Sequence, residues 1–257
     1  MPMRCNTKTK SVGRSSRAPT LKKDQRHLPK SVLRYSRVNS AENNATFADR
    51  EQLVIATRQL IDESMVMMVA DERVVARATS LIDQATELLA EQRALGGGRT
   101  SEYRSHDEYL PRSPVVGTLS PIAPGTFKWS LSVDDSCPER LQCTAVGSMR
   151  AAYEGPPAHV HGGMIALIFD EVLGIINIAN NCPGMTGKLE VRYRRPTPLF
   201  VELRCVARID RIEGRRVHSH AELWNGETLC AEANALFIQP KSFPTPIDAH
   251  DHRSLLG

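Results

Sequence analysis

The sequence contains no long uninterrupted apolar run. No stretch of about 18 consecutive apolar residues occurs, which is the length that a transmembrane helix needs. The N-terminus also lacks the apolar segment of a secretory signal peptide. We therefore expect neither a membrane span nor secretion.

Paired cysteine motifs are also missing. The six cysteines are scattered, and no two of them form a Cys-x-x-Cys pair. In a chain of 257 residues, this spacing favours reduced thiols in a cytoplasmic protein over a disulfide framework or a zinc site. His159 and His161 form a His-x-His pair, but no third ligand lies near them in the sequence. We expect no metal and no cofactor.

Acidic residues are nearly absent from the first 40 positions. This segment holds eleven Lys and Arg residues and one acid, whereas the rest of the chain holds 22 basic and 28 acidic residues. Because residues 1–40 also lack apolar periodicity, we expect a disordered basic tail. An organellar transit peptide has the same composition. A nucleic-acid-binding arm is less favoured, since the segment carries no binding motif.

Helical periodicity begins after residue 40. Residues 41–98 are predicted to form a helical hairpin, in which Asp71 caps the second helix and three glycines end it. We expect its apolar stripe to pack against the rest of the protein. Residues 99–125 contain four prolines and are expected to form an extended connection that lies along the domain.

The pattern then changes to that of a single α+β domain over residues 126–240, followed by a C-terminal tail at 241–257. Two strand-like runs precede an apolar helix and four follow it. In the later runs apolar and polar residues alternate, as in Val201–Asp210, which is typical of antiparallel strands with one buried face. The predicted fold is an antiparallel sheet wrapped around a central helix.

The central helix combines features that a plain core helix does not need. From Met164 to Phe169 it is apolar on every face, which predicts burial all round. It begins at Gly162 and Gly163, where backbone N–H groups have no partner within the helix. It also contains Asp170, a carboxylate that is costly to bury unless it is paired or functional. These features predict a catalytic element.

The motifs Gly155-Pro156-Pro157 and His161-Gly162-Gly163, with Asp170 nine residues after the histidine, resemble the hotdog-fold acyl-CoA thioesterases. The similarity is to the PaaI-like branch of the 4-hydroxybenzoyl-CoA thioesterase superfamily and covers roughly residues 105–240. It implies hydrolysis of acyl-CoA to free acid and CoA, a role in lipid metabolism, and a homodimer with composite sites. Further pairing into a tetramer is left open. This chain departs from the other members at position 155, where it has Gly155 and they have an Asn.

Four residues are candidates for the chemistry. Asp170 would act as general base or as nucleophile. The Gly162 N–H, with the positive end of the helix behind it, would donate to the thioester oxygen. Thr186 falls where some members carry a functional Thr, and it would hydrogen-bond the water or Asp170. His161 would fix the loop by hydrogen bonds.

Five further residues are candidates for substrate binding: Gly163, His159, Arg192, Arg194 and Arg195. His159 or a backbone amide would replace the missing Asn. Arg192 and Arg194 alternate with apolar residues and are expected on the outer face of the sheet. With Arg195 they could bind CoA phosphates, because guanidinium groups suit phosphate geometry. A solvated charged face is the alternative.

Helix geometry predicts that the site is shared between chains. Gly162 and Asp170 are eight residues apart, or roughly 12 Å along a helix at 1.5 Å per residue. Both can act on one thioester only if they come from two helices that run antiparallel. Two other functions stay open: a hotdog hydratase or dehydratase, and a catalytically silent acyl-CoA-binding module.

Overall fold

The computed structural model describes residues 45–94 and 110–241. The predicted basic tail at 1–40 lies outside the described residues, as does nearly all of the predicted C-terminal tail. Within the described ranges, an N-terminal pair of helices precedes an α+β domain.

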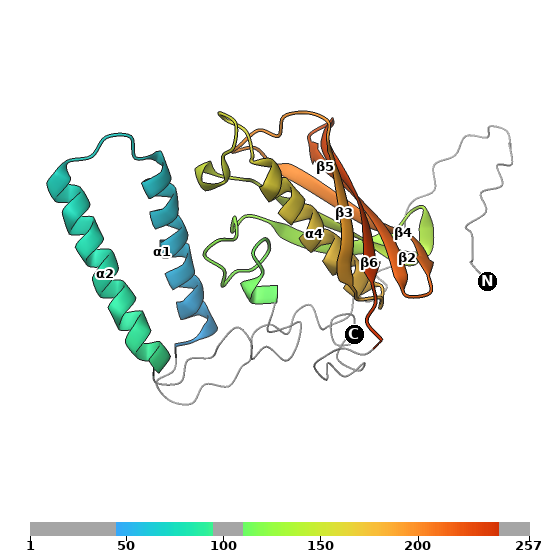
Figure 1. Ribbon diagram of the computed structural model, residues 1–257, viewed down its shortest axis with the longest axis horizontal. Helices are drawn as coiled ribbons and strands as arrows, with labels where there is room; N and C mark the ends of the chain where they lie inside the picture. Colours follow the sequence, from blue (N-terminus) through green and yellow to red (C-terminus); the bar gives the residue numbers. More distant parts are fainter. Residues whose placement is uncertain (1–44, 95–109, 242–257) are drawn as a thin grey trace, which may run out of the picture.

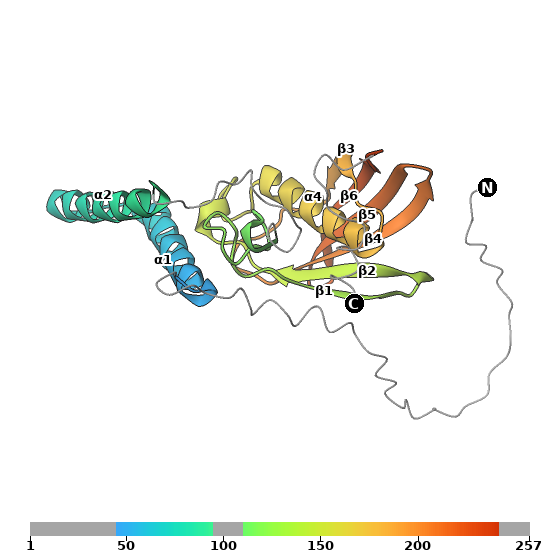
Figure 2. The same cartoon turned by 90° about the horizontal axis from the view of Figure 1, so that it is seen from below.

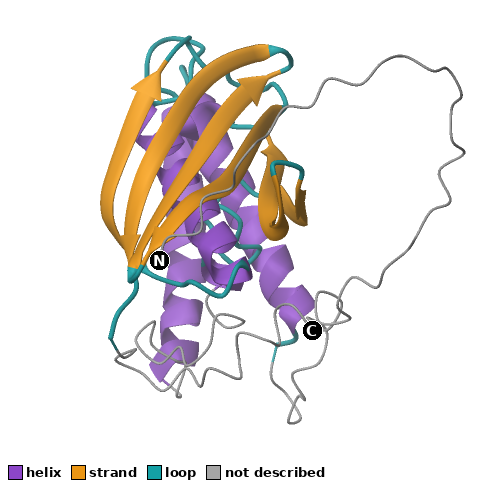
Figure 3. Cartoon of the chain, turned by 90° about the vertical axis from the view of Figure 1, so that its right-hand side faces the viewer, coloured by secondary structure: helices purple, strands orange, loops and turns teal. Residues whose placement is uncertain are grey.

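The domain is a six-stranded antiparallel sheet that curves around one helix (Figures 1 and 3). The strands are β1 (Lys128–Asp134), β2 (Cys137–Gly147), β3 (Met185–Tyr193), β4 (Leu203–Glu213), β5 (Arg216–Asn225) and β6 (Thr228–Ile238). Their order in the sheet is β1-β2-β4-β5-β6-β3, and the helix α4 (Gly162–Ala179) follows β2 in the chain. The predicted arrangement of two strands, a helix and four strands is confirmed.

The inner face of the sheet is lined by the residues that the alternating pattern placed there. On β4, β5 and β6 the buried positions that follow the alternation are Leu203, Cys205, Ala207, Ile209, Val217, Ser219, Ala221, Leu223, Ala231, Ala233, Ala235 and Phe237. Cys230 on β6 is buried as well, although the alternation places it on the opposite face. Many of these side chains are small, which lets the sheet curl closely around α4. The end of α4 is tied to β2 because Asn180 hydrogen-bonds both the N–H and the C=O of Leu141.

Helix α4 is not buried all round, which corrects the prediction. One side, with Ile168, Phe169 and Val172, is fully buried against the sheet. The opposite side is only half-buried, and its members recur at helical spacing: Leu167, Asp170, Glu171, Gly174 and Ile178. By length and composition alone α4 could cross a membrane, but half of it is buried inside the domain. The apolar sequence predicted a covered helix, whereas the sheet of one chain covers one face only.

The N-terminal helices α1 (Phe47–Val66) and α2 (Glu72–Ala94) form the predicted pair, and the Asp71 carboxylate caps α2 by accepting from the Arg73 N–H at 2.8 Å. The expectation that their apolar stripe packs on the protein is wrong for Leu53 and Leu60 of α1, which are exposed, and also for α2. Its large apolar residues are exposed: Val74, Val75, Leu81, Ile82, Leu88 and Leu89. These residues are exposed because α1 lies between α2 and the domain (Figures 1 and 2).

The described part of the predicted extended connection, residues 110–125, is a series of tight turns that begins with the 3-10 helix η3 (Leu110–Arg112). The Ser113 hydroxyl accepts from the N–H groups of Val115 and Val116, and this bends the chain. Val115 and Ala123 are buried, so the segment does lie along the domain as expected. A second short helix, η4 (Ala151–Tyr153), leads into the loop before α4.

Candidate active site

The loop before α4 folds tightly onto the start of the helix. The Gly155 N–H donates to the His159 carbonyl at 2.9 Å, and the His161 N–H donates to the Tyr153 carbonyl at 2.9 Å. A Cβ atom on Gly155 would lie 2.8 Å from the His161 Cα, which is too close for a side chain. Position 155, where the resembling family has Asn, is therefore occupied by the one residue that fits this turn.

His161 is the N-cap of α4. Its ring Nδ1 accepts the Gly163 N–H at 3.0 Å, so in the neutral ring the proton lies on Nε2. This agrees with the predicted role of His161 in fixing the loop. It also occupies the Gly163 amide, which is therefore not free to bind a substrate.

The Gly162 amide is differently placed. Among the described residues, no acceptor takes its N–H, whereas its carbonyl accepts from the Tyr193 hydroxyl at 2.8 Å. It is the first residue of an 18-residue helix, whose N-terminal end carries partial positive charge. An open donor with this charge behind it suits an oxygen on which negative charge develops.

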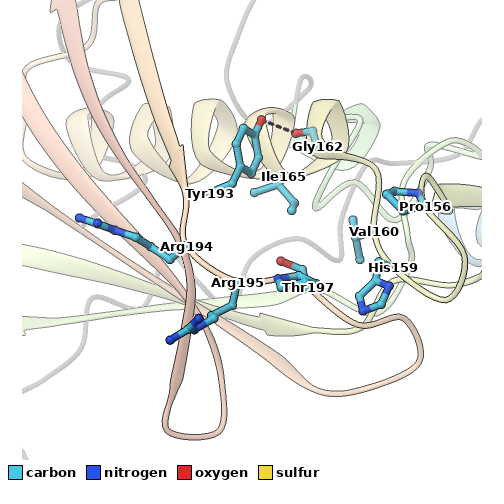
Figure 4. A pocket seen from close by; sticks show the side chains of 10 residues that line it. Pro156, His159, Val160, Gly162, Ile165, Tyr193, Arg194, Arg195 and Thr197 are labelled. Carbon is cyan, nitrogen blue, oxygen red and sulfur yellow. Dashed lines mark hydrogen bonds between the residues drawn. The ribbon is translucent and has the colours of Figure 1, made fainter.

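A cavity of about 420 Å³ lies beside this amide (Figure 4). Its lining comes from the loop before α4, the first turn of α4, and the end of β3 with the chain that follows: Pro156, His159, Val160, Gly162, Ile165, Tyr193, Arg194, Arg195, Pro196 and Thr197. Of this group, His159, Gly162, Arg194 and Arg195 are predicted from the sequence. Tyr193, which lies between Arg192 and Arg194, and Thr197, two residues after Arg195, are not.

Asp170 and Thr186 meet away from this cavity. The Thr186 hydroxyl donates to Asp170 Oδ1 at 2.7 Å, which confirms the predicted contact between the two side chains. Thr186 lies at a bulge in the pairing of β3 with β6, between Thr186 and Lys188. The Asp170 carboxylate is therefore held on the half-buried side of α4, and its Oδ2 remains available for other contacts.

The three arginines differ in what they contact. Arg192 is exposed on the outer face of β3, as predicted, whereas Arg194 is exposed in the chain just after β3 ends. Both lie near Glu232, at 3.9 and 2.6 Å. The hydrogen bond from Arg194 lowers the pKa of the Glu232 carboxyl. Arg195 forms no ion pair with any residue in the described ranges. In Figure 4 the guanidinium groups of Arg194 and Arg195 extend outward from the cavity rim.

Other nucleophiles are poorly suited to reaction. Burial raises the pKa of the Cys143 thiol to about 12 and that of Cys182 to about 11, so thiolate is scarce near neutral pH. Over residues 45–94 and 110–241, no group of three or more His, Cys, Asp or Glu side chains could hold a metal ion. The carboxylates on α4 are Asp170 and Glu171.

One chain does not bring all the candidates together. The open amide and the cavity lie at the head of α4, whereas Asp170 lies eight residues further along the same helix, roughly 12 Å away at 1.5 Å per residue. A carboxylate side chain does not reach across that distance. The geometry therefore leaves each end of the site incomplete within a single chain.

Part of the chain is similar to known thioesterases. Residues 158–232 match the model of the Thioesterase superfamily. Acyl-coenzyme A thioesterase THEM4 of Xenopus laevis is 37% identical over 89 residues, which is 34% of this chain and 40% of that protein. THEM4 of Mus musculus is 35% identical over 88 residues, 34% of this chain and 38% of that protein. The matched region thus spans about two fifths of these curated relatives.

The fold is shared with solved structures. A crystal structure of a thioesterase superfamily protein superimposes with a TM-score of 0.60 at 24% identity, covering 77% of this chain and 97% of the other. The α+β domain therefore has the hotdog fold that the sequence resemblance implied.

Proposed function

We propose that this hotdog-fold chain hydrolyses acyl-CoA thioesters to free acid and CoA. The observation that carries the proposal is that α4 presents two groups suited to thioester hydrolysis. The Gly162 N–H has no acceptor among the described residues and faces a cavity, and the Asp170 carboxylate is held by a hydrogen bond from Thr186. The names of the matched relatives, acyl-coenzyme A thioesterases, support the same reaction class.

The proposed chemistry assigns one task to each group. The thioester carbonyl accepts the Gly162 N–H, and the positive end of α4 stabilises the oxyanion as it forms. Asp170 removes a proton from the attacking water, or attacks the carbonyl carbon itself to form an anhydride that water then opens. In either route the carbon–sulfur bond breaks and CoA leaves as a thiolate that takes up a proton.

We further propose that the site is completed by a second copy of the chain. Two features support a dimer. One is the half-buried side of α4, and the other is β3, which is an edge strand of the sheet. If two α4 helices run antiparallel across a twofold axis, the Gly162 amide of one protomer faces the partner's Asp170. Each dimer then carries two composite sites.

A reducing, cytoplasmic location is also a proposal. It is supported by the five cysteines of the described ranges, all of which are free thiols, and four of which are buried.

The reaction is tested with a panel of acyl-CoAs of increasing chain length and detection of the free thiol. Asp170→Asn should fold normally and lose about two or more orders of magnitude in kcat, the scale of a positioned acid or base. Asp210→Asn, which changes an exposed carboxylate on β4, is the matched control and should keep wild-type rates. Wild-type protein that binds acyl-CoA without releasing thiol would instead be a silent binding module.

A further inference from the structure

Four polar side chains join the N-terminal helices to the loop before α4. Arg58 and Asp62 lie one turn apart on α1, which packs against η4. Arg150 is the N-cap of η4, and Tyr153 is its last residue. The Arg150 guanidinium lies 2.9 Å from the Asp62 carboxylate, so an ion pair joins the two elements directly. We call these four residues the α1–η4 junction.

The side chain of Tyr153 is held by a segment that α1 also binds. Tyr153 is only 8% exposed, and its hydroxyl donates to the Ile122 carbonyl at 3.1 Å. Arg58 donates to carbonyls of the same 110–125 segment, at Gly117 and Ser120. Burial raises the pKa of the Tyr153 hydroxyl, so this group stays protonated and remains a donor near neutral pH.

The backbone of Tyr153 holds the head of α4. Its carbonyl accepts the His161 N–H at 2.9 Å, and the His161 ring accepts the Gly163 N–H at 3.0 Å. The Gly162 N–H lies between them and has no acceptor among the described residues. This N–H shares one planar peptide unit with the His161 carbonyl, so its direction follows from how His161 is held. The open amide is therefore aimed through the bond between His161 and Tyr153.

We propose that Tyr153 is a positioning residue for the Gly162 amide, and that α1 sets the place of Tyr153 through the α1–η4 junction. The proposal rests on the proposed function, in which this amide stabilises the oxyanion. Tyr153 is not among the residues that line the cavity, so it acts through His161 and not on the substrate. The N-terminal helices are then part of the catalytic unit, and a change in the docking of α1 changes turnover.

The first test is Tyr153→Phe, which keeps the ring and removes only the hydroxyl. The Gly162 amide is proposed to bind the developing oxyanion more strongly than the substrate carbonyl, so a misplaced amide lowers kcat more than it changes KM. Across the panel of acyl-CoAs, we expect kcat to fall about fivefold, the scale of one hydrogen bond, and KM to stay within about twofold. A wild-type kcat would overturn the proposal.

Ser219→Ala is the matched control for a loss of stability alone. Ser219 is 1% exposed, and its hydroxyl also donates one hydrogen bond, to Asn177 Oδ1 at 2.7 Å. Asn177 lies near the end of α4, away from Gly162. We expect Ser219→Ala to lower the melting temperature at least as much as Tyr153→Phe does and to keep the wild-type kcat. If the two variants lose the same fraction of kcat, general destabilisation explains the effect and the proposal is wrong.

Hydrogen exchange of the His161 amide gives a readout that needs no turnover. In Tyr153→Phe this amide should exchange about fivefold faster than in the wild type, because its acceptor is less firmly held. In Ser219→Ala it should exchange at the wild-type rate. Unchanged exchange in Tyr153→Phe would show that the hydroxyl does not fix the Tyr153 carbonyl, which contradicts the proposal.

Asp62→Asn tests the part that α1 takes. It removes the charge that pairs with Arg150, and Glu63→Gln, which changes the exposed neighbouring carboxylate, is the control. Asp62→Asn should lower kcat and speed exchange of the His161 amide, each about twofold, since the ion pair is partly exposed. Glu63→Gln should change neither. If the two variants behave alike, α1 does not set the place of Tyr153.

The two proposals fail in different ways. If no acyl-CoA is hydrolysed but the His161 amide exchanges faster in Tyr153→Phe, the proposed function is wrong and the positioning by Tyr153 stands. If hydrolysis is confirmed and Tyr153→Phe keeps the wild-type kcat, only the role of Tyr153 is wrong. Should Tyr153→Phe fail to fold, Asp62→Asn carries the same two readouts.

Discussion

Replacement of Arg58 by Leu should release the N-terminal helices from the domain. Arg58 lies on α1 and is only 7% exposed. Its guanidinium donates to three backbone carbonyls of the 110–125 segment: Gly117 at 2.7 Å, Thr118 at 3.3 Å, and Ser120 at 2.8 and 3.1 Å. The only other buried residue on α1 is Val54, so Arg58 is the one buried polar side chain that attaches this helix.

The magnitude follows from what the substitution leaves behind. Removing the guanidinium leaves three backbone carbonyls without their donor, at a cost of about 1–3 kcal/mol each, because an unsatisfied buried acceptor keeps its desolvation cost. Burial lowers the pKa of Arg58, which shows that its charge is already costly in this position, so we take the low end. About 3 kcal/mol raises the population with α1 detached by roughly 150-fold. The Asp62–Arg150 ion pair, at 2.9 Å and partly exposed, offsets little of this.

Hydrogen exchange measures this directly. Amides of α1 should lose protection in Arg58→Leu, while amides of α4 should keep theirs. In Arg58→Lys, which retains the charge but not the fork of donors, the protection of the α1 amides should lie between that of the wild type and that of Arg58→Leu. If α1 in Arg58→Leu exchanges as slowly as in the wild type, the attachment does not depend on this network and the reasoning is wrong.

Two further substitutions probe the site. Thr186→Val removes the 2.7 Å hydrogen bond to Asp170, so kcat should fall about tenfold with little change in KM; a wild-type kcat would show that Thr186 does not position the carboxylate. Gly155→Ala places a Cβ 2.8 Å from the His161 Cα, so the free energy of unfolding, measured by thermal unfolding, should fall by about 1–3 kcal/mol. Turnover should fall as well. Unchanged melting would mean that the loop before α4 adjusts freely.

The sequence predicted the sheet well because strand burial follows a local rule. Alternation along residues 203–209 places every second side chain on one face, and that face is the buried one. The contact between Asp170 and Thr186 was also anticipated, from resemblance rather than from periodicity. It depends on α4 and β3 lying side by side.

Other features depend on distant parts of the chain and could not be read from local patterns. Thr197 and Tyr193 line the cavity because the end of β3 and the chain after it lie beside the first turn of α4. The sequence also did not predict that the apolar stripe of α2 is exposed or that one side of α4 is only half-buried. An apolar face in a sequence predicts that something covers it, but does not identify which segment or which chain does so.

The central claim is that one active site is built from two chains, and mixing two inactive variants tests it most directly. Asp170→Asn removes the carboxylate, and Gly162→Val fills the space beside the amide, since even a Cβ there lies 3.3 Å from the Tyr193 ring. When the two are unfolded and refolded together, about half of the dimers are mixed, and each has one intact and one doubly damaged site. A site shared between two chains predicts recovery of roughly a quarter of wild-type activity. Mixed dimers that form and show no activity would contradict it.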